Sequence, residues 1–262
     1  MFTMFRRFAA ALACICVISF LPLNARADEP SVLRAAIDDT EQYFTAPVRW
    51  DAEDWTMAGV ALAAVASAHA FDSRIRDHFA PTPGGLNGGQ DSNSLRDALP
   101  AVALIGGTLM AAGFLDDRDG YKETLRLVEA GVFSTVTAEA LSVAAGRERP
   151  DGTTSPNQWR QGGDAFPSVH ASAAFAIGMT FAESGNDDYR WIRRIVGYAV
   201  AGGTAYIRVK DNLHWASDTV AGAAIGIATA RFVLNREEGG HSQIGFAPQK
   251  GGWMLSYTVP LH

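Results

Sequence analysis

Apolar residues recur at three- and four-residue spacing along most of this chain, in alanine-rich stretches separated by clusters of Gly, Pro and Asp. That spacing places apolar side chains on one face of an α-helix. The pattern predicts an all-α protein, organised as a single-domain helical bundle. The predicted helices cover residues 31–43, 53–70, 94–115, 122–145, 169–183, 189–207 and 215–234.

Two segments depart from the helical pattern. Residues 81–94 are rich in Gly, Asn, Asp and Pro, which predicts a surface loop. Residues 244–247 and 253–259 flank a turn that contains Gly251-Gly252, and the second segment alternates in character. This pattern predicts a short C-terminal β-hairpin. We therefore expect a core at 52–236 and a tail at 237–262.

The N-terminus has the three parts of a secretory signal peptide. Residues 1–7 carry two arginines and no acid, residues 8–21 are almost wholly apolar, and a small-x-small pattern ends at Ala27. We expect cleavage after Ala27, which makes residues 1–27 a signal peptide and residues 28–262 a periplasmic or secreted protein. The alternative is a retained membrane anchor. Both cysteines, Cys14 and Cys16, lie in this segment, so the mature protein has no thiol for a disulfide, a nucleophile or a metal.

Charge limits the partners of the mature protein. Removing the three arginines of the signal peptide leaves 19 of the 22 basic residues against 28 acidic ones, and takes the formal charge from −6 to −9. This balance argues against non-specific binding to nucleic acid or to anionic lipid surfaces. Peripheral contact with a membrane stays open, and the oligomeric state cannot be read from the sequence.

The apolar runs are short for membrane spans. A span needs about 20 consecutive apolar residues. The longest uncharged runs of the mature chain, 55–71 and 99–115, contain His69, glycines and many alanines, and the mean hydropathy of the whole chain is close to zero. We therefore expect a soluble bundle with buried helices rather than a membrane-embedded one.

Candidate chemistry begins with a histidine and an aspartate near the start of the last helix. His214 and Asp218 are four residues apart, a spacing that puts both on one helical face, and Arg208 precedes them. A carboxylate on one imidazole nitrogen fixes the tautomer and leaves the other nitrogen free to attack. An ordinary surface His/Asp pair is the alternative.

Two further blocks could complete an anion site. Ser168 precedes an apolar run and is a candidate N-cap, so the amides from Val169 onward would face an anion beside the imidazole of His170. Arg149 is followed by Pro150, which ends the preceding helix, and its guanidinium matches two phosphate oxygens. An ordinary capped helix explains the first block equally well, and Arg-Pro alone indicates almost nothing.

The three blocks together are more specific than any one of them. Gly-Arg-x-Arg-Pro, Ala-Phe-Pro-Ser-x-His-Ala and His-x-x-Ser-Asp-x-x-Ala-Gly follow one another between about Ser142 and Asp218, and continue into the last helix. In this region the chain resembles the type 2 phosphatidic acid phosphatase (PAP2) superfamily, which includes bacterial acid phosphatases and vanadium haloperoxidases. The resemblance implies a helical-bundle phosphatase that hydrolyses phosphomonoesters or lipid phosphates through a phosphohistidine, without a metal or another cofactor.

The resemblance also implies a role for each residue. His214 corresponds to the nucleophile, Asp218 to its orienting partner and His170 to the general acid that protonates the leaving alcohol. The phosphate ligands implied by the resemblance are Arg149, Arg208, Ser168, Val169 and His170. No His-Glu-x-x-His motif, Asp-rich calcium loop or cysteine pair in the mature sequence indicates a metal site.

Two positions depart from the family pattern. Ser142 stands where the family has a lysine, and Ile207 stands where it has a serine. A hydrogen bond to a charged group contributes about 1.5–3 kcal/mol, so we expect a weakened or altered phosphate site, with Arg147 as an auxiliary ligand that could replace the lysine. Two other functions stay open: a vanadium-dependent haloperoxidase, in which vanadate would be the cofactor rather than an inhibitor, and a degenerate anion-binding module without turnover.

Overall fold

The computed structural model describes residues 32–79, 94–115, 118–185, 189–237, 243–249 and 252–258. The chain divides into two compact units, residues 1–48 and 49–262. The described part of the first unit is helix α2 (Val32–Thr45) and the start of the short 3-10 helix η1 (Ala46–Arg49). The predicted signal peptide and the predicted loop at 81–93 lie outside the described residues.

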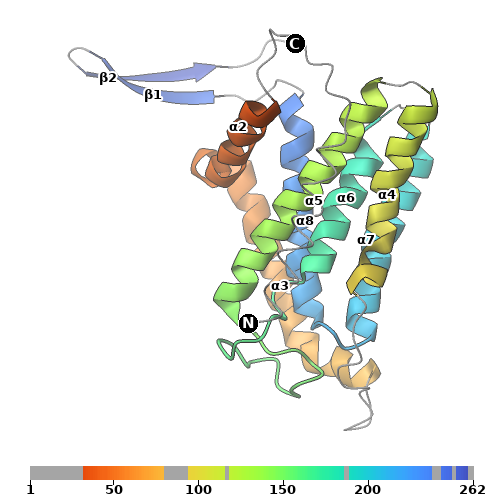
Figure 1. Ribbon diagram of the computed structural model, residues 1–262. Helices are drawn as coiled ribbons and strands as arrows, with labels where there is room; N and C mark the ends of the chain where they lie inside the picture. The colour runs from red at the N-terminus through yellow and green to blue at the C-terminus, as the bar shows by residue number, and fades with distance from the viewer. Residues whose placement is uncertain are drawn as a thin grey trace. The chain divides into compact units, whose positions relative to one another are not determined.

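Helices dominate the second unit, and their arrangement is drawn in Figure 1. Helix α6 is central, because it packs against α5, α7 and α8 and more weakly against α4, while α3 packs against α8. The all-α class is confirmed. The described helices of this unit are α3 (Ala52–Phe79), α4 (Ser94–Leu115), α5 (Arg118–Ala145), α6 (Val169–Glu183), α7 (Arg190–Lys210) and α8 (Ala216–Glu237).

Small residues let the helices around α6 approach until their backbones touch. A Cβ placed on Gly178 of α6 would lie 2.4 Å from the carbonyl oxygen of Gly197 in α7, and one on Gly226 of α8 would lie 2.4 Å from that of Ser172. Gly222 and Gly226 are four residues apart on α8, the small-xxx-small spacing that brings helix backbones together. The glycines therefore set the distance between α6 and its neighbours.

The predicted helices agree closely with the observed ones, with one informative exception. Residues 94–115 and 169–183 are reproduced as predicted, whereas α3 continues to Phe79 instead of ending at residue 70. The extension contains Asp72, Arg76 and His78. Asp72 is buried against an arginine of another segment, and the two basic residues lie in the last turn, where the helix dipole favours them. The charged residues after residue 70 are thus accommodated within the helix.

The prediction of a soluble, periplasmic or secreted bundle is wrong. Within the described residues, three helical segments are long and apolar enough to cross a membrane: Ala98–Leu115, Asp119–Ala145 and Ala216–Arg236. Only 17% of Ala98–Leu115 is buried inside the protein. Large apolar side chains of α4 face outward instead, namely Leu99, Val102, Met110, Phe114 and Leu115. Such a surface fits the hydrocarbon of a bilayer and indicates an integral membrane protein.

The error came from counting unbroken uncharged residues. Asp119–Ala145 and Ala216–Arg236 both contain charged residues, but Arg236 Nη2 donates to Glu129 Oε2 at 3.0 Å across the two helices. A charge that is paired inside a helical bundle, or that lies near the end of a span, costs far less than an isolated one. The length of a helix and the apolar character of its outward face therefore indicate a membrane span better than the length of an uncharged run does.

After α8 the backbone forms two antiparallel strands, β1 (Gln243–Gln249) and β2 (Gly252–Thr258). Gln249 pairs with Gly252 next to the turn. Only the backbone pairing of these strands is described, so the C-terminal hairpin stays a prediction.

Candidate active site

Two loops meet at the end of the bundle where α5 and α7 finish and α6 and α8 begin. The long loop 146–168 is visible at one end of the helices in Figure 1. Its backbone is tied to the α7–α8 loop: Ser168 N donates to the carbonyl oxygen of Asp218 at 3.0 Å, and the indole of Trp215 donates to that of Glu148 at 2.9 Å. Within the loop, Ala165 N donates to the carbonyl oxygen of Arg147 at 2.9 Å. The three blocks separated in sequence therefore adjoin in the fold.

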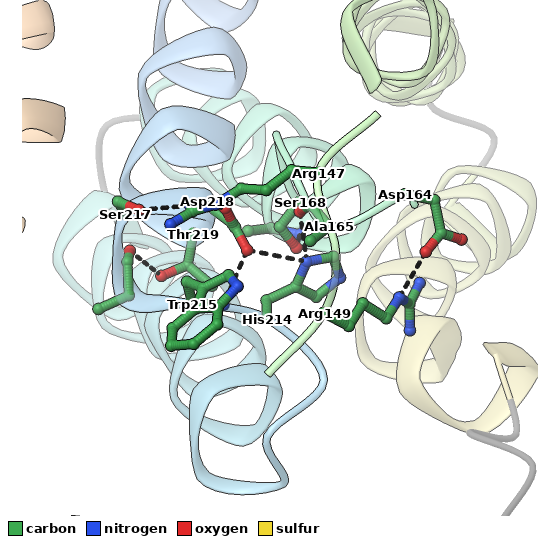
Figure 2. Close-up of polar contacts among 12 residues, drawn as sticks. Arg147, Arg149, Asp164, Ala165, Ser168, His214, Trp215, Ser217, Asp218 and Thr219 are labelled. Carbon is green, nitrogen blue, oxygen red and sulfur yellow. Dashed lines mark hydrogen bonds and ion pairs between the residues drawn. The ribbon is translucent and has the colours of Figure 1, made fainter. Parts of the chain in front are cut away.

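His214 lies in the middle of this arrangement and is almost fully buried. Its Nδ1 is 2.7 Å from the carbonyl oxygen of Ala165 and 3.8 Å from Oδ2 of Asp218, as Figure 2 shows. A carbonyl oxygen can only accept, so Nδ1 carries the proton and Nε2 keeps its lone pair. The predicted orienting hydrogen bond from His214 to Asp218 is replaced by one that Nδ1 donates to the carbonyl oxygen of Ala165, while Asp218 Oδ2 lies 3.8 Å away.

The surroundings of His214 keep its imidazole neutral. Burial lowers the pKa of His214 well below its usual 6.5, and the positive charges of Arg149 and Arg208 lower it further. The hydrogen bond to Ala165 opposes this shift, and His170 adds to it. An unprotonated imidazole is the form that can attack. The charges of the two arginines and of His170 thus act on the same histidine.

The two arginines come from different segments. Arg208 is buried in the last turn of α7, and its carbonyl oxygen accepts from the amide of His214 at 3.2 Å. Arg149 is partly exposed, and its Nε donates to Oδ1 of Asp164 at 2.6 Å (Figure 2). This hydrogen bond is donated by Nε and does not involve the terminal nitrogens Nη1 and Nη2. Asp164 escaped the sequence analysis because nothing in its neighbourhood marks it as a partner of Arg149.

The predicted N-cap is present. Ser168 precedes α6, is fully buried, and accepts from the amide of Ala171 at 3.4 Å through its Oγ. Val169 is the first residue of the helix, so its amide has no acceptor within the helix itself. Helix N-termini bind anions through such amides. Ser168, Val169 and His170 thus form the cap and the first turn of α6, and their role as phosphate ligands stays a prediction.

Arg147 has a different place from the auxiliary one that we predicted. All five donors of its guanidinium face acceptors within the protein. The partners of this guanidinium include the carboxylates of Asp72 and Asp218. Its central carbon, Cζ, lies 4.5 Å from the centre of the Trp159 ring. No donor is left for a phosphate. Ser142, the position of the family lysine, is buried in α5 and its carbonyl oxygen accepts from Gly146 N at 2.9 Å.

Asp72 of α3 joins the site from a segment that the sequence analysis did not consider. Its Oδ1 accepts from the amide of Ser217 at 2.9 Å, and its Oδ2 accepts from Ser217 Oγ at 2.6 Å and from Arg147 Nη2 at 2.8 Å. His69 Nδ1 lies 3.0 Å from the same oxygen. The only signal in the sequence was an acid three residues after a histidine at the end of an apolar stretch. Among the side chains that the structure describes, no group of three or more His, Cys, Asp and Glu could hold a metal.

Comparison with known proteins agrees with this geometry. Residues 123–238 match the family model of the PAP2 superfamily, a stretch that contains the three blocks. The resemblance to the PAP2 superfamily is confirmed. The lipid A 1-phosphatase of Porphyromonas gingivalis is 39% identical over 82 residues, which are 31% of this chain and 16% of that protein. A PA-phosphatase related-family protein of Dictyostelium discoideum is 28% identical over 152 residues, 52% of this chain and 55% of its own.

The chain thus spans about half or less of the length of these two PAP2-type relatives. Among solved structures, it is similar to the transmembrane PAP2-type phosphatidylglycerolphosphate phosphatase of Bacillus subtilis, with a TM-score of 0.40 and 16% identity. That similarity covers 78% of this chain and 96% of the solved one.

Proposed function

We propose that this protein is a membrane-integral phosphatase that hydrolyses a phosphomonoester, with a lipid phosphate as the preferred class of substrate, through a phosphohistidine and without a metal. One observation carries the proposal. The proton of His214 lies on Nδ1, bound to Ala165, which leaves Nε2 to attack in a setting of two arginines and a helix N-terminus. These groups offer a nucleophile and positive charge to a single anion.

In the first step, Nε2 of His214 attacks the phosphorus, and the bond from phosphorus to the leaving oxygen breaks. His170, in the first turn of α6, gives its proton to that oxygen as it departs. The guanidinium groups of Arg149 and Arg208 and the helix N-terminus at Ser168 neutralise the charge on the other phosphate oxygens. The imidazole now bears phosphorus on Nε2 and hydrogen on Nδ1, so it is cationic.

In the second step, water replaces the histidine. His170, now neutral, accepts a proton from a water molecule whose oxygen attacks the phosphorus. The bond from phosphorus to nitrogen breaks, its electron pair returns to Nε2, and inorganic phosphate leaves. The charge of Asp218, 3.8 Å from Nδ1, favours the cationic ring that exists between the two steps.

The outer surface of the protein supports the proposed substrate class. A site at the end of apolar helices that face a bilayer can take a phosphate whose acyl chains stay in the lipid. Two of the similar proteins are described as phosphatases of lipids, lipid A and phosphatidylglycerolphosphate. Both facts support a lipid phosphate over a soluble ester.

Phosphate release by the full chain in detergent tests the proposal. We expect release from phosphatidate in mixed micelles, with p-nitrophenyl phosphate as a poorer substrate. Activity should survive EDTA and be inhibited by orthovanadate. His214→Ala should lose at least about a thousandfold in kcat, because among the described residues of the site we assign the attack on phosphorus to His214 alone. Halide oxidation with added vanadate, in place of phosphate release, would contradict a phosphatase, and rescue by a divalent ion after EDTA would contradict the metal-free site.

A further inference from the structure

Asp72 lies at the centre of a buried group of charges beside His214. Asp72, Arg147 and Asp218 each have a fully buried side chain. The guanidinium of Arg147 lies between the two carboxylates, with one terminal nitrogen on Asp72 and the other on Asp218. Figure 2 shows the second half of this chain of contacts, from Arg147 to Asp218 and on to His214.

This group also links the position of Asp72 to that of Asp218. Arg147 binds both carboxylates, and His69 Nδ1 lies 3.0 Å from Oδ2 of Asp72. Oδ2 of Asp218 lies 3.8 Å from Nδ1 of His214. A change at Asp72 therefore reaches the side chain beside the imidazole of His214 through Arg147.

Asp72 also holds the segment that carries the catalytic residues. Its two oxygens accept from the amide and the hydroxyl of Ser217, in the first turn of α8. Asp218 follows directly, and its Oδ2 accepts from the amide of Trp215 at 2.7 Å. One carboxylate on α3 therefore binds the arginine that Asp218 also binds and holds the turn on which Asp218 lies.

We propose that Asp72 is a positioning residue of the reaction: by binding Arg147 and Ser217, it holds the first turn of α8 so that Asp218 lies beside His214 while the histidine carries the phosphoryl group. The inference rests on the proposed function. Asp72 does not touch the substrate and acts through Asp218.

The experiment is a double-mutant cycle on Asp72→Asn and Asp218→Asn, with the exposed Asp77→Asn of the same helix as a matched control. Each full-length variant is assayed in detergent for phosphate release, and its active fraction is titrated by the burst of phosphohistidine. We expect Asp72→Asn to lower kcat at least about tenfold, the loss typical of a hydrogen bond to a charged group, with KM changed less than threefold. In the Asp218→Asn background the same change should have less than a threefold effect.

A pH profile separates positioning from simple destabilisation. The groups facing His214 are Arg149, Arg208, His170, Asp218 and the carbonyl of Ala165. A displaced Asp218 changes the surroundings of the imidazole, so the acid limb of kcat/KM should move in Asp72→Asn in the same direction as in Asp218→Asn. A merely destabilised protein would show fewer active molecules and an unchanged profile.

Each outcome decides the inference. An Asp72→Asn protein with the kcat and pH profile of Asp77→Asn would overturn it, as would losses that multiply independently in the double variant. If Asp72→Asn does not fold, Asp72→Glu decides: the retained charge should keep the wild-type pH profile, and the profile of Asp218→Asn would overturn the proposal. Absence of phosphate release from the wild type would instead overturn the proposed function.

Discussion

Gly222→Ala tests whether close packing of α8 on α6 sets the geometry of the site. Gly222 lies over the N-terminus of α6, and a Cβ added there would be 2.5 Å from the carbonyl oxygen of Ser168 and 3.1 Å from both Ala171 Cβ and Ser172 N. Two of these three atoms belong to backbone, which cannot turn aside as a flexible side chain can. Ser168 is the cap of the helix that we place against the phosphate.

The size of the perturbation follows from these distances. Ordinary contact at a Cβ begins at 3.4 Å, so the carbonyl of Ser168 must retreat by about 0.9 Å from its 2.5 Å position. A displacement of this size at a catalytic site can lower kcat/KM by about a hundredfold. Overpacking costs about 1–3 kcal/mol of stability, from which the better helix propensity of alanine returns about 1 kcal/mol.

Two matched variants make the measurement specific. Gly226→Ala meets backbone of α6 at 2.4 Å one turn farther from the site, so it should lose stability but less activity. Gly202→Ala on α7 meets nothing within 4 Å and should keep both. The assays are thermal unfolding and phosphate release in detergent. A Gly222→Ala protein within threefold of the wild-type kcat/KM would refute the argument, because the clash would then be relieved without moving Ser168.

Three further predictions concern the chemistry. His170→Ala should lower kcat for a lipid phosphate about 10²–10⁴-fold and for p-nitrophenyl phosphate much less, since p-nitrophenolate leaves without a proton; equal losses would argue against a general acid. Arg149→Gln removes a positive charge that lowers the pKa of His214, so the acid limb of kcat/KM should move to higher pH, and a fixed limb would contradict the assignment. Ser142→Lys should tighten vanadate inhibition by roughly tenfold, or about 1.4 kcal/mol, and unchanged inhibition would show that this position does not reach the phosphate.

The local pattern of apolar and polar residues predicted much of the fold, and the three sequence blocks supplied the main candidate residues of the site. The spacing of apolar residues predicted helices at 94–115 and 169–183 that the structure reproduces, because amphipathic spacing and helix caps act within a few residues. The three blocks also named His214, Arg149 and Arg208 as candidate site residues, and the charges of both arginines lower the pKa of His214. Candidate site residues that lie within a few positions of one another can be recognised from a short sequence motif.

Tertiary structure alone decided which partners these residues have. Asp72 meets Ser217 across 145 positions, and Nδ1 of His214 binds a carbonyl 49 positions away rather than the acid four residues on. Any peptide carbonyl can accept a hydrogen bond, so no side chain marks Ala165 as the partner. The sequence likewise shows that α4 is apolar, but it does not show which of its side chains face the bundle and which face the lipid. Whether an apolar residue lies inside the bundle or against lipid depends on which neighbouring helices cover it, and that is a property of packing.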